Sequence, residues 1–230
     1  MGAIQKVSRT KLELFLDCPR CFWIDVKQGV KRPSGPPFTI NLAIDSLLKG
    51  EFDVHREKGT KHKIMERYEI DAIPFQHENM NKWRHNFTGV QFEHKKSNFL
   101  VFGAVDDIWV NPDGELMVVD YKATGAKEHR IYDSYRRQME VYQWLLRQNG
   151  FDVSPTGYFV FARVNKGGGF GNGVAALSFD LFIEPLVGDD SWVDKALMAA
   201  RKTFDMTSAP DATPTCEYCN YRNAAVNVGA

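Results

Sequence analysis

The fold of this chain is decided by residues 103–122, which read GAVDDIWVNPDGELMVVDYK. The run NPDG at 111–114 is typical of a type I turn, because it places Asn first, Pro second and Gly where φ turns positive. The usual hairpin on such a turn has a three-residue loop closed by a glycine bulge, which pairs Asn111 with Glu115. The stretch therefore predicts a β-hairpin with a defined register.

That register brings three charged side chains to one face of the hairpin. Every cross-strand pair has the same sum of residue numbers, so Asp106 is expected opposite Asp120, with Cβ atoms about 4.5–5.5 Å apart. Lys122 lies two residues further along and points to the same face. A two-residue loop would instead bring Asp107 opposite Asp120, but the turn residues favour Asp106. Two opposed carboxylates repel unless a cation or a proton intervenes. We therefore expect these side chains to bind a divalent metal and a phosphate group that is attacked there. The alternative is that both aspartates are charged residues at strand ends that face solvent.

Further motifs follow in a fixed order along the chain. Gly103-x-x-Asp106 precedes Asp120-x-Lys122, and Gln138-x-x-x-Tyr142 comes after both. Residues 8–20, SRTKLELFLDCPR, read as an opening helix with a cysteine, and residues 216–221, CEYCNY, as a closing cysteine segment. Together these elements resemble the PD-(D/E)XK nuclease superfamily in its RecB-like branch. That branch includes the AddB nuclease domain and the CRISPR-associated exonucleases that carry a cysteine cluster. The resemblance covers nearly the whole chain.

The resemblance implies an α/β fold with a restriction-endonuclease-like core. Its central mixed β-sheet would carry the active-site hairpin between flanking helices, and a four-cysteine metal site would join the termini. Residues 1–230 would form a single nuclease domain. Within it, residues 59–97 would be a family-specific insertion, while 1–25 and 207–230 would form the cysteine-cluster lobe.

The implied activity is that of a metal-dependent DNA nuclease, an exonuclease on single strands or duplex ends. Asp106, Asp120 and the backbone carbonyl of Tyr121 would hold one or two Mg²⁺ or Mn²⁺ ions. Lys122 would orient the attacking water or stabilise the transition state. The alternative is a catalytically silent module that binds nucleic acid or protein, although a silent copy has no need to keep both carboxylates and the lysine.

Gln138 and Tyr142 lie four residues apart on one face of a predicted helix, so they could reach one ligand together. The resemblance implies that the pair supports the active site or the DNA end. The alternative is a tyrosine in the core with a glutamine at its rim.

A third metal ligand is expected on the helix that follows the Pro-rich stretch 30–38. The resembling family often has a histidine there, whereas this chain has Asp45, a hard oxygen ligand suited to Mg²⁺ or Mn²⁺. Glu51 and His62 are rivals for this role. Asp45 could also simply lie on the polar side of its helix.

The four cysteines form two Cys-x-x-Cys pairs, Cys18 with Cys21 and Cys216 with Cys219. We predict that they converge on one metal centre. The resembling branch usually has one N-terminal and three C-terminal cysteines, so Cys21 is additional and Ala225 stands about where the last one would be. The resemblance favours a [4Fe–4S] cluster, but two such pairs suit tetrahedral zinc equally well.

The charge balance excludes a globally basic protein, because 29 Lys and Arg residues face 29 Asp and Glu residues. A nuclease of this composition needs a local basic groove. The candidates for a phosphate-binding strip are Lys122, Lys127, Arg130, Arg136, Arg137 and Arg147. The expected partners are DNA and, by resemblance, proteins of CRISPR adaptation or recombination. No apolar run is long enough for a membrane span, and few paired cysteines indicate a reducing compartment, so we expect a cytoplasmic protein.

Periodicity and breaker residues predict the remaining elements. We expect helices over residues 11–25, 39–55 (capped by Thr39), 128–148 (ending at Asn149-Gly150) and 191–206. We expect a loop over 30–38 and strands over 98–110, 115–123, 156–163 and 174–182.

Overall fold

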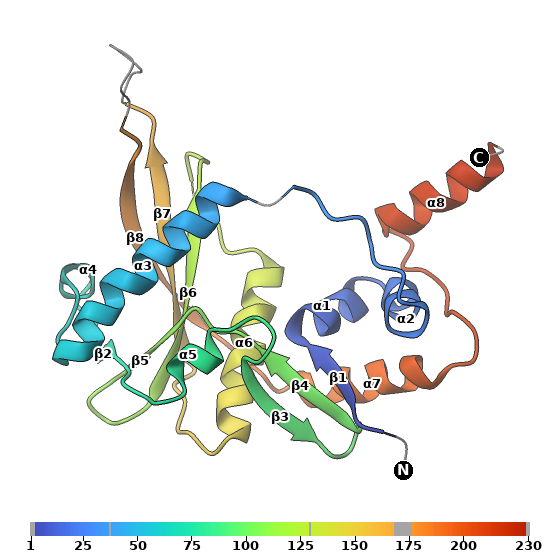
Figure 1. The fold of residues 1–230 in the computed structure, drawn as a ribbon, viewed down its shortest axis with the longest axis horizontal. Coiled ribbons are helices and arrows are strands. Elements are labelled where there is room, and N and C mark those ends of the chain that lie inside the picture. The colour runs from blue at the N-terminus through green and yellow to red at the C-terminus, as the bar shows by residue number, and fades with distance from the viewer. Residues whose placement is uncertain (1–2, 37, 129, 168–175, 229–230) are drawn as a thin grey trace. The chain divides into compact units, whose positions relative to one another are not determined.

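The computed structural model describes residues 3–36, 38–128, 130–167 and 176–228 (Figure 1). The chain divides into two compact units. The first comprises Met1–Pro36, Gln91–Phe102 and Ser191–Ala230, and the second comprises Pro37–Val90 and Gly103–Asp190. None of the described helices combines the length and the apolar character that crossing a bilayer requires.

The second unit is built on a five-stranded sheet in the order β2-β5-β6-β7-β8. The strands are β2 (Ile73–Pro74), β5 (Asp107–Val110), β6 (Leu116–Thr124), β7 (Thr156–Asn165) and β8 (Ser178–Val187). β6 and β7 run parallel while the other neighbours are antiparallel, so the sheet is mixed. This confirms the predicted α/β fold class with a mixed sheet.

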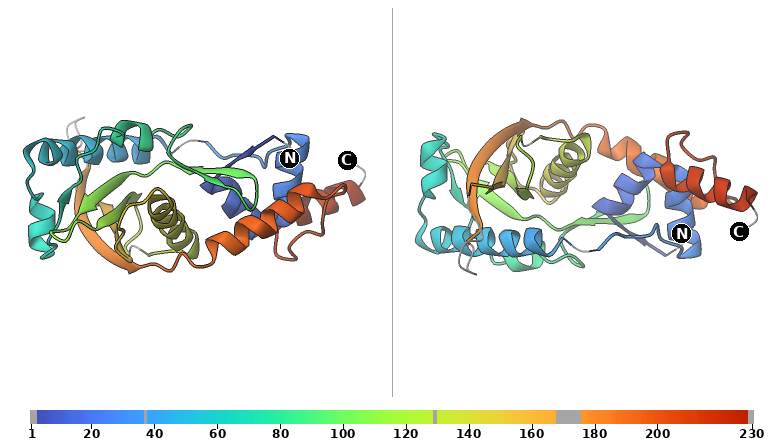
Figure 2. Two further views of the ribbon diagram at one scale, coloured as in Figure 1. Left: turned by 90° about the horizontal axis from the view of Figure 1, so that it is seen from below. Right: turned by 90° about the horizontal axis from the view of Figure 1, so that it is seen from above.

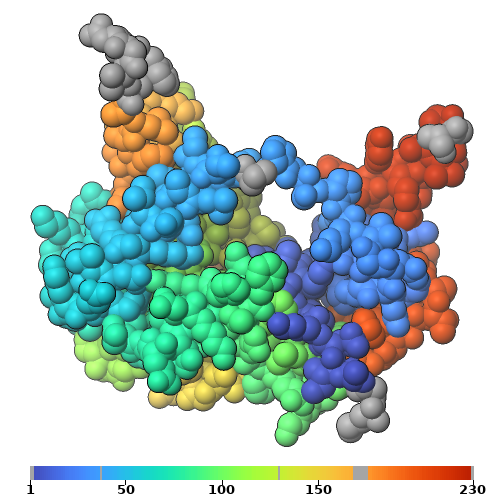
Figure 3. Space-filling model, in the orientation of Figure 1, coloured from blue at the N-terminus to red at the C-terminus, as the bar shows by residue number. Residues whose placement is uncertain are grey.

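Two long helices cover opposite faces of this sheet, α3 (Thr39–Lys58) and α6 (Asp133–Gln148) (Figure 2). Phe52 of α3 packs into a core with Trp109 and Tyr121 on one face. On the other face, Gly157 leaves room for the Met139 side chain of α6. The side chains of α3 also form part of the surface seen in Figure 3.

The predicted hairpin is present with the predicted register. Asp107 pairs with Val119 and Val110 with Leu116, which are the pairs that the three-residue loop requires. The Asn111 N–H donates to the Glu115 carbonyl at 3.1 Å, and Gly114 takes the expected positive φ of 85°. Asp106 lies one residue before the first of these pairs.

The single strand predicted over 98–110 is wrong, because the chain leaves the ladder after Gly103. β4 (Phe99–Gly103) belongs to a different sheet, and β5 starts only at Asp107. Between them the Val105 N–H donates to the Trp83 carbonyl at 3.1 Å. Gly89, at φ 60°, approaches the Gly103 carbonyl so closely that an added Cβ would lie 2.3 Å from its oxygen.

The first unit contains a three-stranded sheet in the order β1-β4-β3, formed by β1 (Gln5–Ser8), β4 and β3 (Val90–His94). Its helices are α1 (Arg9–Asp17), α2 (Pro19–Gln28), α7 (Val193–Asp205) and α8 (Glu217–Asn227). The continuous helix predicted over 11–25 is wrong, because Cys18 is extended (φ −156°, ψ 107°) and separates α1 from α2. Pro19 explains the break, since a proline disfavours the helical conformation in the residue before it.

Several other predicted boundaries shift. The helix expected over 39–55 reaches Lys58 and has Phe38, not Thr39, at its N-cap. The helix expected from residue 128 begins at Asp133, while its end at Asn149-Gly150 is confirmed. The strand expected over 156–163 extends to Asn165, and that over 174–182 is Ser178–Val187, with residues 174–175 outside the described ones. The stretch 59–97 contains α4 (Lys63–Arg67), β2, α5 (Met80–Trp83) and β3. That 59–97 is an insertion, and that 1–230 is one domain with a cysteine lobe, stay predictions.

Candidate active site and cysteine centre

Acidic and basic side chains alternate where the hairpin of the second unit begins. Asp106 is fixed by the neighbouring strand, because one of its carboxylate oxygens accepts the Tyr121 backbone N–H at 3.1 Å. Its other oxygen accepts from Lys49 Nζ, also at 3.1 Å. Lys49 in turn lies 2.7 Å from the carboxylate of Asp45, one helical turn earlier on α3. Lys49 thus bridges two of the predicted metal ligands.

The pKa shifts follow from this arrangement. Burial raises the pKa of Asp45, and the charge of Asp106 raises it further. Burial alone would lower the pKa of Lys49, but the charges of Asp106 and Asp45 outweigh it, and the pKa rises. The carboxylates therefore require a cation between them. Carboxylate oxygens are the hard donors that Mg²⁺ and Mn²⁺ prefer, so the donor chemistry suits such an ion. Asp45, Asp106 and Asp120 are nevertheless not grouped closely enough in this structure to form an ion-binding set by themselves.

Asp120 is more deeply buried than Asp45, Lys49 and Asp106. Its side chain is fully buried, forms an ion pair with Lys122 and accepts a hydrogen bond from Gln138 Nε2 at 2.8 Å. The same amide nitrogen donates to Tyr142 Oη at 3.2 Å. Burial opposes the charge of Lys122, but Asp120 and Asp106 outweigh it and raise its pKa. The ammonium group of Lys122 therefore lies in the field of both hairpin carboxylates.

The two rivals for the role of Asp45 pair with each other. His62 Nε2 lies 2.8 Å from a carboxylate oxygen of Glu51, and the imidazole stacks on the Phe52 ring at 4.7 Å.

A buried ionic network below the site was missed by sequence reasoning. Asp107 is fully buried and forms ion pairs with Arg56 and Arg84. Its other oxygen accepts the Tyr121 hydroxyl at 2.7 Å. Arg84 Nε donates to the Asp106 carbonyl at 2.9 Å, and the Arg84 guanidinium also holds Asp53. The network fixes the backbone of Asp106 and the ring of Tyr121 from the core side.

The alternation of the hairpin was the available signal for Asp107. Asp106 points to the face of Asp120, so Asp107 must point to the opposite, core face, where a carboxylate needs a buried cation. The partners are far along the chain and carry no local pattern that identifies them.

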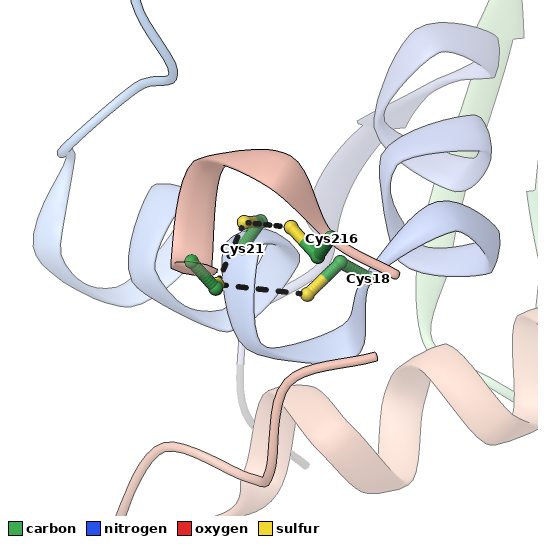
Figure 4. A group of neighbouring side chains, drawn as sticks. Cys18, Cys21 and Cys216 are labelled. Atoms are coloured by element: carbon green, nitrogen blue, oxygen red, sulfur yellow. Dashed lines mark hydrogen bonds between the residues drawn. The ribbon is translucent and has the colours of Figure 1, made fainter. Parts of the chain in front are cut away.

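The four cysteines of the first unit converge, as predicted. The Sγ atoms of Cys18 and Cys219 lie 3.9 Å apart, and Cys21 Sγ lies 3.6 Å from Cys216 Sγ and 3.5 Å from Cys219 Sγ. All four lie within 4.8 Å of one another and are buried. Figure 4 shows the labelled sulfurs turned toward one another. Within the described ranges, they are the one group of three or more His, Cys, Asp or Glu side chains close enough to hold an ion.

The thiol chemistry of this cluster fits a metal. Burial opposes the Cys18 thiolate, but backbone hydrogen bonds from Cys21 and Thr213 outweigh it and lower the pKa to about 6. Burial and the neighbouring thiols raise the pKa of Cys219 to about 12. Cys18 therefore ionises readily, whereas a thiolate at Cys219 is disfavoured and would be stabilised by a bound cation. Arg32 contributes positive charge, since its guanidinium lies 3.2 Å from Cys216 Sγ.

A family model matches most of the chain. The family model of the PD-(D/E)XK nuclease superfamily matches residues 42–224. No curated protein matches the chain. Among solved structures, a chain titled "Crystal structure of SSO0001" is similar, with 14% sequence identity and a TM-score of 0.43, covering 97% of this chain and 86% of that one.

Proposed function

The chain belongs to the PD-(D/E)XK nuclease superfamily, and from this premise we propose that it is a DNA nuclease that cleaves at the Asp106, Asp120 and Lys122 site. The superfamily consists of metal-dependent nucleases. The observation that supports the proposal is the contact of Asp106 with the Tyr121 N–H and Lys49, and of Asp120 with Lys122. Two carboxylates and a lysine are the groups that metal-assisted phosphodiester hydrolysis uses. We further propose exonuclease action on single strands or duplex ends.

The finer classification rests on the motifs. Gly103-x-x-Asp106, Gln138-x-x-x-Tyr142 and the cysteine pairs support the RecB-like branch, with the AddB-type and CRISPR-associated exonucleases. Membership of that branch would make proteins of CRISPR adaptation or recombination the natural partners.

We assign the divalent ion, Mg²⁺ or Mn²⁺, to Asp106, Asp120 and the Tyr121 carbonyl, with Asp45 as a further oxygen donor. A divalent ion bound there would lower the pKa of a water molecule and neutralise charge that builds on the attacked phosphate. The protein's part is to hold these oxygens in place. Tyr121 contributes to this positioning in two ways. Its N–H donates to the Asp106 carboxylate, and its hydroxyl donates to Asp107.

The remaining residues act on the phosphate and on the carboxylate. Lys122 stays protonated at neutral pH because its pKa is raised, so its ammonium group can orient the attacking water or stabilise the transition state. Gln138 is a positioning residue, since its amide holds one oxygen of Asp120. Tyr142 fixes the Gln138 amide in turn.

We propose a structural metal for the cysteine centre. The resemblance supports a [4Fe–4S] cluster. The sulfur spacing of 3.5–3.9 Å between contacting pairs supports zinc as a second candidate, because zinc–sulfur bonds of about 2.3 Å in a tetrahedron separate the sulfurs by about 3.8 Å. Metal and sulfide analysis of protein purified without air distinguishes the two.

Calorimetric titration with Mn²⁺ tests the carboxylate site. Asp106→Asn should lose most of the Mn²⁺ affinity while its melting temperature stays near that of the wild type. Asp107→Asn should instead lower the melting temperature, because it disturbs a buried ionic network. Asp113→Asn, in the exposed turn, is the matched control and should change neither quantity. Undiminished Mn²⁺ binding by Asp106→Asn would remove Asp106 from the site.

A further inference from the structure

Basic side chains lie close together at the C-terminal ends of β6, which carries Asp120 and Lys122, and of its neighbour β7. β6 and β7 are parallel, so their C-terminal ends share one edge of the sheet, and the register pairs Lys122 with Phe161 and Thr124 with Arg163. Side chains two residues apart on a strand point to one face. Arg163 therefore lies on the same face of the sheet as Asp120 and Lys122. It is about 7 Å beyond Lys122 along the strand direction, a distance of two residues.

A hollow of about 370 Å³ opens at this edge, lined by Lys127, Arg163 and Lys166 together with Asp180. Arg163 is held in place, because its guanidinium donates to the Lys127 carbonyl at 2.9 Å and lies 4.2 Å above the Phe182 ring. None of the three cations forms an ion pair with a carboxylate in the described part of the chain. Their charge is thus available to a ligand.

A second group of side chains, two tyrosines and an arginine, extends from Lys122. Lys122 Nζ lies 4.7 Å above the Tyr135 ring, and Tyr135 meets Tyr132 edge-on at 5.3 Å. The Tyr132 side chain is 54% exposed, and the Arg130 guanidinium lies 5.7 Å from its ring. An exposed ring beside a cation is an arrangement on which an unstacked base can stack.

Two other arginines of the predicted strip make contacts elsewhere. Arg147 forms an ion pair with Asp190, and Arg136 donates to the Val187 carbonyl at 3.4 Å. Lys127 and Arg130 of the predicted strip remain candidates, and the fold adds Arg163 and Lys166, which sequence reasoning did not single out.

We propose that Lys127, Arg130, Tyr132, Arg163 and Lys166 form a basic edge that binds single-stranded nucleic acid next to the active site. The inference rests on the proposed nuclease function and adds the path of the strand to it. The cations bind the phosphates that adjoin the attacked one, and Tyr132 stacks on a base. The ring selects a single strand because bases within a duplex are already stacked on one another.

Fluorescence anisotropy with a labelled oligothymidylate tests the cations in the presence of a chelator, so that no cleavage occurs. Lys127→Gln and Lys166→Gln should each weaken binding and should each reduce the slope of log affinity against log salt by about 0.7, the value for one lost phosphate contact on a single strand. Lys82→Gln, which changes an exposed lysine of α5, is the matched control and should keep the wild-type slope. Wild-type slopes in both edge variants would overturn the proposal.

The stacking contact has its own matched pair. Tyr132→Leu should weaken oligothymidylate binding about fivefold or more, whereas Tyr132→Phe, which keeps the ring, should bind like the wild type. Binding of a blunt duplex should change little in either variant. An equal loss on the duplex would show a duplex-binding surface and overturn the single-strand assignment.

The two proposals fail separately. If the wild type cleaves DNA and all edge variants bind as it does, the basic edge is wrong and the nuclease assignment stands. If the wild type never cleaves DNA while the edge variants lose binding, the edge stands and the nuclease assignment falls.

Discussion

Asp106 and Asp107 are adjacent in the chain, yet their carboxylates have opposite surroundings. Asp106 is held by Lys49 and by the Tyr121 N–H on the site face. Asp107 is fully buried against Arg56 and Arg84. The first is the proposed ligand of a divalent ion, while the second uses its oxygens to fix the hairpin. One step along the chain thus separates the proposed ligand position from a structural one.

Lys122→Ala is expected to separate chemistry from binding. The variant should lower the single-turnover cleavage rate by about 10²–10³-fold, because it removes a charge aimed at the transition state. DNA affinity should change little, since one cation among several phosphate contacts contributes modestly. Rates and affinities measured on one labelled oligonucleotide check this, with Lys82→Gln as a control. A loss of affinity as large as the loss of rate would make Lys122 a docking residue.

Part of the candidate site could be predicted from local rules. Turn chemistry and strand alternation place Asp106, Asp120 and Lys122 on one face, and helical spacing joins Gln138 to Tyr142. Lys49 was within reach of the same rule, because it lies one helical turn after Asp45. The basic partners of Asp107 were not, because the fold brings them together from distant segments.

At the scale of elements, local chemistry predicted turns and helix ends better than strand partners. The NPDG turn fixed the register of β5 and β6, and the Cys18-Pro19 sequence could have revealed the break between α1 and α2. The division of 98–110 into β4 and β5 depends on Gly89 approaching Gly103, a contact between distant segments that no window of sequence contains.

Gly89→Ala should destabilise the protein more than Gly114→Ala. Both glycines have positive φ, so both variants incur backbone strain of about 1–3 kcal/mol. Only at Gly89 would the new Cβ also meet backbone, 2.3 Å from the Gly103 oxygen, whereas nothing lies within 4 Å at Gly114. Urea denaturation of the two variants measures the difference. Equal losses would show that the close approach of the two backbones does not constrain the fold.

At the scale of the whole molecule, the cysteines connect segments from the two ends of the sequence. Cys18 and Cys21 come from the region of α2, and Cys216 and Cys219 from the start of α8. The first unit has a small three-stranded sheet, so a metal that binds only the folded arrangement would contribute directly to its folding free energy.

Cys216→Ser should therefore give a protein with little bound metal, lower solubility and lower stability. It should lose activity through unfolding rather than through chemistry, because no cysteine lies in the active-site hairpin. Elemental analysis, the visible absorption spectrum and thermal denaturation measure these effects. Thr215→Ser, a change at the exposed neighbouring residue, should leave all three as in the wild type. A Cys216→Ser protein with full metal content and stability would contradict a shared centre.

Divalent-ion-dependent degradation of labelled single-stranded DNA tests the nuclease assignment most directly. The wild type should shorten the strand with Mg²⁺ or Mn²⁺ and leave it intact with a chelator. Asp120→Asn, in which the amide cannot replace the charge of the carboxylate, should be inactive under all conditions. DNA that stays intact with the wild type at every Mg²⁺ and Mn²⁺ concentration, while the protein still binds it, would contradict the assignment and identify a silent nucleic-acid-binding module.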